Sequence, residues 1–243
     1  MCLISVGFGL SDRYSLVIAA NRDERHARPS EPARWWADEP DILGGRDEVA
    51  GGSWLAIDRR GRVAAVTNFF EPPRTGAPRS RGELVVDFLR GGAGAEAFSV
   101  DLDRNADEYG PFNLLLFDGQ ALRYASNRSH PRGFGPGIHV LSNGAPGIQW
   151  PKVRRAEQGL AEAVAGPTPE DALFDLLAER DSNAEPPDSY RRSLFILDPV
   201  FGTRCSTVLM LDSPARTAFF VERRFDAAGR TSGESRIEFE LID

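Results

Sequence analysis

The sequence predicts an α+β fold in which antiparallel sheets carry helices on their faces. Apolar runs follow one another in pairs, and each pair is separated by a short polar or glycine-containing break, which is the pattern of β-hairpins. The few segments with helical periodicity do not alternate with strands, so a doubly wound parallel sheet is not expected. The 243-residue chain contains no repeat or linker, and a single domain over residues 1–243 is predicted.

Composition narrows the class of protein. The chain is 41% hydrophobic and 27% charged, and its formal net charge of −7 argues against nucleic acid as a main partner. No apolar stretch approaches the roughly 20 residues of a membrane helix, and the start of the chain lacks the basic segment of a signal peptide. Two cysteines do not form a disulfide framework, so a cytoplasmic location is expected.

The first predicted element is a hairpin formed by residues 2–20 around a polar break. Centring the hairpin on Asp12 places Cys2 opposite Arg22, and a slip of one residue would place Asp23 there instead. In either register, a thiol near the chain start faces a guanidinium and a carboxylate.

Residues 25–52 contain three prolines and are predicted to be mostly irregular. Trp35 and Trp36 lie in the middle of this segment. They either anchor the loop to the body of the protein or line the wall of a pocket.

The remaining elements follow from periodicity and from turn and capping residues. Ser80 and Glu83 have the spacing of a capping box, and Thr168 begins a sequence that resembles a second one. The predicted strands cover residues 53–58, 62–69, 112–118, 121–126, 137–143, 193–197, 203–211, 217–222 and 235–241. The predicted helices cover residues 80–91, 93–107, 151–164 and 168–180, and loops are predicted at residues 72–78 and 181–190.

Cys2 is the first candidate for chemistry. Loss of Met1 would leave a free α-amine on the residue that carries the thiol, and an amine that titrates at about 7.7–8.0 suits a general base. An arginine such as Arg22 lowers the pKa of a nearby cysteine, and Asp23 could orient or hold the amine. The alternative is that Cys2 is a small, half-buried residue with no chemical role.

Three further polar residues lie at the ends of predicted strands. Asn68 and Asn143 either close turns or donate side-chain amide hydrogen bonds to an oxyanion. Arg204 is either solvated or placed to bind a carboxylate or phosphate. Cys205 alternates to the face opposite Arg204 and is interpreted as a small core residue.

No cofactor and no metal are predicted. His26, His130 and His139 lack metal-ligand spacing with one another or with either cysteine. The sequence contains no phosphate-binding loop and no dinucleotide fingerprint.

A set of ordered motifs extends nearly from end to end of the chain. They are Met1-Cys2, Ala20 to Glu24 (ANRDE), Arg28-Pro29, Gly51 to Leu55 (GGSWL), Thr67-Asn68, Arg81 to Leu84, Phe112 to Leu114, Leu141 to Asn143 and Gly202 to Arg204. Together they resemble the NRDE family, which is the same as the Transport and Golgi organisation protein 2 family. That family is similar to N-terminal nucleophile (Ntn) hydrolases of the penicillin acylase and bile salt hydrolase kind. The resemblance therefore implies a four-layer αββα sandwich of two antiparallel sheets.

The resemblance also implies roles for the residues at the chain start. Cys2 matches the nucleophile of these hydrolases, which follows the initiator methionine. Arg22 and Asp23 match the arginine and aspartate that steady the thiolate and the amine, although these two residues are adjacent here and spaced apart in the hydrolases.

Asn68 and Asn143 match the oxyanion and amine-holding asparagines of the hydrolases, and Arg204 matches their late arginine. The predicted function is hydrolysis of a non-peptide C–N (amide) bond of a small-molecule substrate through an acyl-enzyme. The alternative is a non-catalytic binding or carrier protein for an apolar ligand such as haem, an acyl-CoA or a lipid. Eukaryotic members of the family have been associated with haem trafficking and with acyl-CoA or lipid metabolism.

Overall fold

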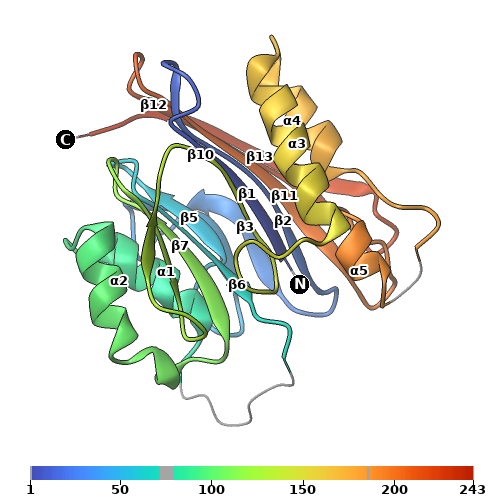
Figure 1. The fold of residues 1–243 in the computed structure, drawn as a ribbon, viewed down its shortest axis with the longest axis horizontal. Coiled ribbons are helices and arrows are strands. Elements are labelled where there is room, and N and C mark those ends of the chain that lie inside the picture. Colours follow the sequence, from blue (N-terminus) through green and yellow to red (C-terminus); the bar gives the residue numbers. More distant parts are fainter. Residues whose placement is uncertain (1, 72–78, 185–186, 243) are drawn as a thin grey trace. The chain divides into compact units, whose positions relative to one another are not determined.

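The computed structural model describes residues 2–71, 79–184 and 187–242, and the chain divides into two compact units (Figure 1). The first unit contains Met1–Arg28, Pro136–Ser142 and Pro146–Glu238, and the second contains Pro29–Gly135, Asn143–Ala145 and Phe239–Asp243. The expectation of a single domain stays a prediction. Met1 and the predicted loop at residues 72–78 lie outside the described residues. Among the helices that are described, none has the length and apolar character needed to cross a bilayer.

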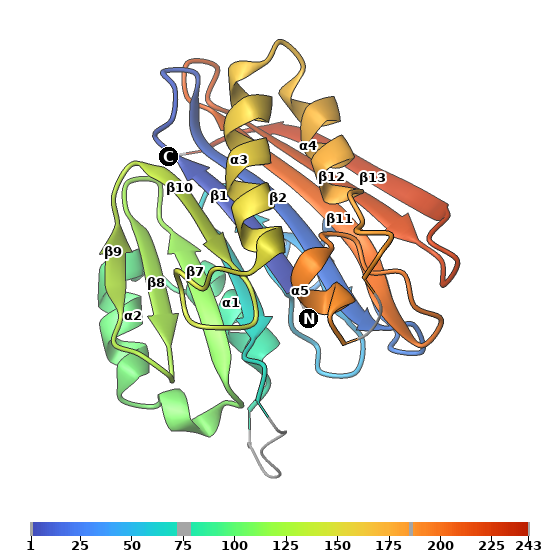
Figure 2. The same cartoon turned by 45° about the vertical axis from the view of Figure 1, so that its right-hand side comes forward.

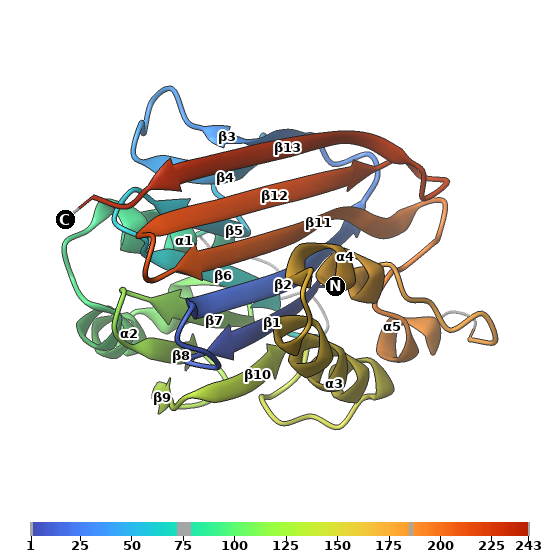
Figure 3. The same cartoon turned by 90° about the horizontal axis from the view of Figure 1, so that it is seen from above.

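The first unit is built on a six-stranded antiparallel sheet with the order β10-β1-β2-β11-β12-β13 (Figure 3). Its strands are β1 (Cys2–Phe8), β2 (Tyr14–Arg25), β10 (Gly137–Leu141), β11 (Phe201–Asp212), β12 (Thr217–Phe225) and β13 (Thr231–Glu240). Its helices are α3 (Pro151–Ala165), α4 (Pro169–Leu177) and α5 (Ser189–Arg192). The strand that begins with Cys2 is therefore held inside the sheet, between β10 and β2.

Helices α3 and α4 cover one face of this sheet (Figure 2). Val17 of β2 packs in one buried cluster with Leu160 of α3 and Leu173 of α4. Leu3 of β1 packs in a neighbouring cluster with Val153, in the first turn of α3. Because side chains alternate along a strand, the odd-numbered residues at the start of β1 face the helices, and Cys2 points to the opposite face.

The second unit is built on a seven-stranded antiparallel sheet with strands in sequence order from β3 to β9. Its strands are β3 (Ser30–Trp35), β4 (Ile42–Asp47), β5 (Leu55–Asp58), β6 (Val63–Asn68), β7 (Phe112–Phe117), β8 (Leu122–Ser126) and β9 (Arg132–Phe134). Helices α1 (Arg81–Arg90) and α2 (Ala95–Asp103) pack against this sheet, and a short 3₁₀ helix, η1 (Ala106–Glu108), follows α2. Leu84 and Phe88 of α1 share a core cluster with Ala64 of β6 and Leu114 of β7.

Most of the predicted elements are confirmed, and so is the α+β class with antiparallel sheets. The three predicted hairpins correspond to the strand pairs β1–β2, β5–β6 and β7–β8. The predicted capping box opens α1: the backbone N–H of Ser80 donates to the carboxylate of Glu83 at 3.0 Å, and the Ser80 hydroxyl accepts a bond from the N–H of Gly82 at 3.3 Å.

The prediction that residues 25–52 are mostly irregular is wrong, because β3 and β4 pair in this segment. Pro32 is compatible with β3 because this strand lies at the sheet edge, and the pairing shifts register between Glu31 and Arg34. Trp36 is 3% exposed, and its ring N–H donates to the carbonyl of Gly44 at 2.9 Å. Trp36 therefore anchors this segment, as the first of the two interpretations predicts.

Two smaller predictions also fail, and one short strand is missing from the prediction. Residues 193–197 do not form a strand; the N–H groups of Leu194 and Phe195 both donate instead to the carbonyl of Glu179. The side chain of Thr168 makes no capping bond at the start of α4. Strand β9 is absent from the prediction, because its three residues are too short to show any alternation.

Candidate active site

Cys2 and Arg22 lie directly opposite each other in the pairing of β1 with β2, which is the register that the hairpin pattern predicts. Opposed residues of an antiparallel pair point to the same face of the sheet. Both side chains are buried: Cys2 is 9% exposed and Arg22 is 7% exposed. The structure thus places a thiol and a guanidinium side by side on the sheet face that α3 and α4 do not cover.

Opposing effects set the pKa of the Cys2 thiol. Burial raises this pKa, and the negative charge of Asp23 raises it further. A hydrogen bond from the backbone N–H of Asp23 to the sulfur and the charge of Arg22 act in the other direction, and the net result is a raised pKa. The thiolate therefore depends on local positive charge and on the Asp23 N–H.

The hydroxyl of Ser142 donates to the backbone carbonyl of Cys2 at 3.1 Å, which fixes the start of β1.

Asp23 is 2% exposed, and its side chain points to the face opposite that of Arg22, since neighbouring residues alternate along β2. Thr203, which lies opposite Asp23 on β11, donates a hydrogen bond from its hydroxyl to the carboxylate at 2.7 Å. Burial raises the pKa of Asp23, while the charges of Lys152 and Arg22 and the Thr203 hydroxyl lower it. The expectation that both a guanidinium and a carboxylate face the thiol is thus only half right. Arg22 shares the face of Cys2, whereas the Asp23 carboxylate lies on the other face and only the Asp23 backbone N–H bonds to the sulfur.

Arg204 occupies a β-bulge on β11. Thr203 and Cys205 pair with neighbouring residues of β2, so Arg204 is an extra residue without a partner position in the ladder. Thr203 and Cys205 consequently point to opposite faces of the sheet, although they are two residues apart. The side chains of residues 203–205 therefore do not simply alternate between the two faces of the sheet. The prediction that Cys205 lies on the face opposite Arg204 depends on that alternation.

The guanidinium of Arg204 donates to the backbone carbonyls of Arg25 and Arg28, at 2.9 Å in each case. Burial lowers the pKa of Arg204, and the nearby charge of Arg22 lowers it further. Arg204 is therefore not fully solvated, and no acidic side chain among the described residues forms an ion pair with it. Arg204 fixes the end of β2 and the turn that follows it.

Cys205 is a buried residue, as its sequence position indicates, with 6% exposure. Burial raises its pKa well above the ordinary value, and a hydrogen bond to the carboxylate of Glu222 raises it as well. Cys2 and Cys205 are both free thiols, and burial raises the pKa of each. Within the described ranges, no group of three His, Cys, Asp or Glu side chains is placed to hold a metal ion.

Lys152 is a site residue that sequence reasoning missed. It is the second residue of α3, it is 0% exposed, and the charges of Asp23 and Cys2 both stabilise its ammonium group. One signal was available: a lysine directly after a proline that starts a helix opposes the helix dipole, which makes it an unusual choice for a purely structural position.

Asn68 and Asn143 lie in the second unit and contact each other. The side-chain amide of Asn143 donates to the backbone carbonyl of Asn68 at 2.8 Å, and the N–H of Phe70 donates to the carbonyl of Asn143 at 2.7 Å. Asn143 is 1% exposed, whereas Asn68 is exposed at the end of β6. Asn68 and Asn143 thus contact each other within the second unit, while Cys2, Arg22, Asp23 and Arg204 lie in the first unit. The roles of the two asparagines toward an oxyanion and an amine stay predictions.

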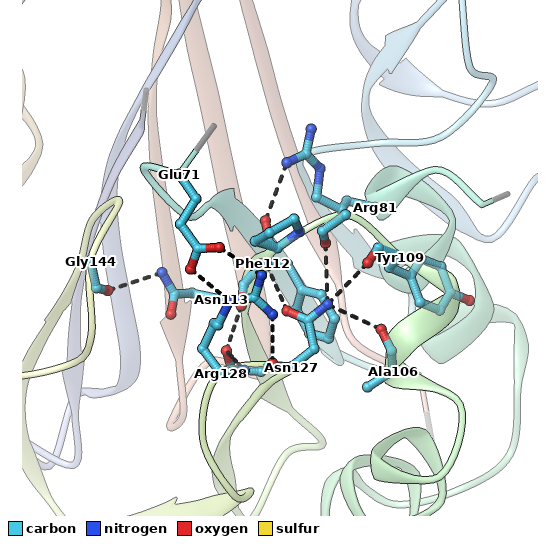
Figure 4. A network of polar contacts seen from close by, with 12 residues as sticks. Glu71, Arg81, Ala106, Tyr109, Phe112, Asn113, Asn127, Arg128 and Gly144 are labelled. Atoms are coloured by element: carbon cyan, nitrogen blue, oxygen red, sulfur yellow. Dashed lines mark hydrogen bonds and ion pairs between the residues drawn. The ribbon is translucent and has the colours of Figure 1, made fainter. Parts of the chain in front are cut away.

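Asn113 supports the segment that carries Asn143 (Figure 4). It is fully buried on β7, and its amide donates to the carbonyl of Gly144 and to the hydroxyl of Thr67, both at 3.2 Å. The hydroxyl of Tyr124 donates to the Asn113 carbonyl oxygen at 2.7 Å. Asn113 belongs to one of the family motifs, but its position in a hydrophobic strand gave it no predicted role.

Two neighbouring contacts complete this network (Figure 4). The amide of Asn127 donates to the carbonyls of Ala106 at 3.1 Å and Tyr109 at 3.0 Å. Arg128 binds both carboxylate oxygens of Glu71, at 2.6 and 2.7 Å. The chain around β7 and β8 is therefore held by side-chain amide hydrogen bonds, from buried Asn113 and half-buried Asn127, as well as by apolar packing.

Comparison with solved structures defines the class of fold. A Caenorhabditis elegans ortholog of N-acylethanolamine-hydrolyzing acid amidase superposes with a TM-score of 0.53 at 12% identity, over 86% of this chain and 92% of that chain. Conjugated bile acid hydrolase from Clostridium perfringens, in a variant whose second-position cysteine is replaced by alanine, also gives 0.53, at 9% identity over 98% and 92% of the two chains. The fold is thus that of the Ntn hydrolases.

The chain belongs to the Transport and Golgi organisation 2 family, whose model matches residues 1–227. The human Transport and Golgi organization protein 2 homolog is 31% identical over 252 residues, which cover 90% of this chain and 91% of the human protein. The homolog from Bos taurus is 32% identical over an alignment of 275 positions that covers 99% of each chain.

Proposed function

We propose that this protein is an N-terminal cysteine amidohydrolase that cleaves a non-peptide C–N (amide) bond through an acyl-enzyme. The observation that carries the proposal is the register of β1 with β2: the Cys2 sulfur lies beside the Arg22 guanidinium and accepts the backbone N–H of Asp23. Both contacts stabilise the thiolate, which is the nucleophilic form of cysteine. The likeness in fold to an acid amidase and to a bile acid hydrolase studied as a variant at its second-position cysteine supports the same assignment.

The proposed reaction uses the chain start as its own base. Removal of Met1 frees the α-amine of Cys2, which accepts the thiol proton. The thiolate attacks the substrate carbonyl carbon, forming a C–S bond and an oxyanion. As the C–N bond breaks, the α-ammonium returns the proton to the leaving amine. Water then attacks the thioester and gives a proton to the α-amine, and the carboxylic acid leaves as the thiol is restored.

The other residues act on the charges that develop in these steps. Asp23 holds the α-ammonium, and Arg22 and Arg204 supply positive charge near the sulfur. The family resemblance gives Asn68 and Asn143 the role of side-chain amide donors to the oxyanion, a role worth roughly 3 kcal/mol of barrier. Because Cys2 and Cys205 are both free thiols, this activity fits a reducing compartment such as the cytoplasm.

The test combines processing, labelling and turnover. Intact mass reports whether Met1 is removed, and a panel of electrophilic and chromogenic N-acyl amides reports acylation of Cys2 and release of the amine. We expect an acyl adduct on the peptide that contains Cys2 and turnover that Cys2→Ala abolishes. Cys205→Ser serves as the matched thiol control, with turnover retained.

Two outcomes would overturn the proposal. A mature chain that retains Met1 has no free amine on Cys2, which removes the self-base mechanism. Stoichiometric binding of haem or an acyl-CoA that Cys2→Ala leaves unchanged, together with no turnover of any amide, would establish the carrier function in place of hydrolysis.

A further inference from the structure

The position of Lys152 is the starting point. Val153, the next residue in the first turn of α3, packs against Leu3 of β1, so this turn lies next to the start of the strand that carries Cys2. Figure 2 shows α3 running along the sheet over β1. Asp23 of β2 also points to this helix-covered face. The ammonium group of Lys152 therefore lies close to the buried carboxylate, and near the strand end that begins with the thiol.

Burial of this ammonium group is unfavourable in several ways. Lys152 is 0% exposed, and no atom of the described residues accepts a hydrogen bond from its Nζ. The positive end of the α3 dipole opposes a cation at this position, and the first turn of α3 holds no acidic residue. The Trp150 ring, 5.8 Å from Nζ, gives only weak compensation. Burial accordingly lowers the pKa of Lys152.

The charges that stabilise the ammonium belong to the candidate active site. They come from Asp23 and, more weakly, from Cys2. Coupling between two ionisable groups is reciprocal, so the ammonium stabilises the Asp23 carboxylate and the Cys2 thiolate by the same amounts. Without it, the α-ammonium group of the chain start and the side chain of Arg22 would have to balance two buried acids.

We infer that Lys152 is a positioning residue of the Cys2 site, whose ammonium group allows the Asp23 carboxylate and the Cys2 thiolate to be charged at the same time. This inference rests on the proposed role of Cys2 as nucleophile. In the inferred role, Lys152 of α3 joins a site whose other residues lie on strands or at their ends. The role also gives a functional reason for the burial of this lysine.

The other charged and titratable groups on elements packed around the first turn of α3 have partners or positions of their own. His139 of β10 lies opposite Val6, on the sheet face away from α3. Glu179, which follows α4, binds Arg155 of α3 at 2.6 Å. Arg191 of α5 lies over the Trp150 ring at 5.8 Å.

Two more titratable groups, Tyr190 and Glu222, lie near Asp23 and Cys205, respectively, rather than near Lys152. Burial raises the pKa of Tyr190 on α5, and the charge of Asp23 raises it as well. On the other side of Arg22, Glu222 lies beside Cys205 and is balanced by Arg224 at 3.4 Å. Asp23 and Cys2 are therefore the two acids whose charge depends on Lys152.

The test measures the ionisation of Cys2 directly. The full chain is treated with iodoacetamide from pH 5 to 10, and alkylation is read by mass spectrometry on the peptide that contains Cys2. For Lys152→Met, which keeps the length of the side chain but not the charge, we expect the rate profile to move to higher pH by at least about one unit, or a loss of about tenfold in rate near neutral pH. Lys152→Arg, which keeps the charge, restores the profile.

The double variant Lys152→Met/Asp23→Asn gives the sharper result. In this variant the charge of Asp23 is removed, so Arg22 and the Cys2 thiolate remain as one cationic and one acidic side chain. The pH profile of the double variant therefore returns toward that of the original chain. Asp23→Asn alone moves the profile to lower pH, and this arm does not depend on the folding of Lys152→Met. A merely structural lysine would lower the melting temperature of Lys152→Met and leave the pH profile unchanged.

The outcomes separate this inference from the proposed function. An unchanged profile in Lys152→Met, or equal shifts in Lys152→Met and Lys152→Arg, would overturn the role of Lys152 while leaving amide hydrolysis by Cys2 intact. A shifted and rescued profile in a protein that turns over no amide would support the charge coupling and refute the hydrolase.

Discussion

The hydroxyl of Thr203 donates a hydrogen bond of 2.7 Å to the buried carboxylate of Asp23. The same hydroxyl accepts a bond of 2.8 Å from the backbone N–H of Ile196, so it satisfies two groups at once. Thr203→Val would leave both groups without this partner in a buried setting. We expect a loss of about 1–3 kcal/mol in the free energy of unfolding, measured by urea denaturation.

Thr207 provides a matched control on the same strand. It is 0% exposed, and its hydroxyl makes no hydrogen bond to any described residue. Thr207→Val removes a buried hydroxyl of the same kind without breaking a bond, so stability is expected to stay constant or to rise. Equal losses from Thr203→Val and Thr207→Val would show that the bond to Asp23 contributes nothing specific.

The capping box of α1 gives a second prediction. Ser80→Ala removes the side-chain bond at the helix N-terminus and should cost about 1 kcal/mol in the free energy of unfolding. Thr168→Ala, at the N-cap of α4, removes a side chain that makes no capping bond and should change stability much less. Thermal unfolding of the two variants under the same conditions measures this difference. A larger loss of stability for Thr168→Ala than for Ser80→Ala would contradict the prediction.

Asn113, the one polar residue of β7, is expected to be sensitive to substitution. Asn113→Ala removes bonds to Thr67 and Gly144 and leaves the buried hydroxyl of Tyr124 without its acceptor. We expect a loss of about 2 kcal/mol or more, whereas Tyr124→Phe, which removes one bond only, should cost about 1 kcal/mol. Similar losses in the two variants would mean that the bonds to Thr67 and Gly144 add little.

Asp118 predicts a pH dependence of stability. Burial raises the pKa of Asp118, but bonds from the backbone N–H groups of Ala121, Ala95 and Gln120 outweigh this effect, and the net pKa is lowered. A carboxyl group whose pKa is depressed in the folded state contributes stability at pH values above its unfolded-state pKa of about 3.9. That stability is lost as the pH falls through the folded-state pKa.

Asp118→Asn should therefore melt at a lower temperature than the original chain at pH 7, and the difference should shrink as the pH falls below about 4. Circular dichroism melts from pH 7 to pH 2.5 measure this convergence. A difference in melting temperature that stays constant over this range would show that the charge of Asp118 is not the stabilising feature.

Local sequence patterns are sufficient to predict the hairpin register that pairs Cys2 with Arg22. Both apolar runs have clear ends, and one polar break fixes the pairing, so the contact depends on residues only twenty apart. The capping box at Ser80 is equally local. In contrast, the strands within residues 25–52 escape prediction because prolines and tryptophans obscure alternation, and an edge strand tolerates both.

The rest of the candidate site depends on contacts between distant parts of the chain. The bulge at Arg204 exists only because β11 pairs with β2, and no pattern within residues 201–212 reveals it. The charge of Lys152 couples to that of Asp23 because α3 packs over β1, and the two residues are well over a hundred positions apart in the sequence. Helical periodicity predicts α3 itself but gives no indication of which strand its first turn covers.

The interior position of β1 has a consequence for biosynthesis. The hairpin of β1 and β2 is complete once about 25 residues have left the ribosome, but the strands that cover its two edges come from residues 137–141 and 201–212. At ~5–20 residues per second, the hairpin edges stay open for roughly 10–40 s during translation. An aminopeptidase that removes Met1 therefore has this nascent-chain interval in which to work, before the closed sheet limits access to Cys2. Under the proposed function, maturation of Cys2 would thereby be tied to the timing of synthesis rather than to later regulation of the finished protein.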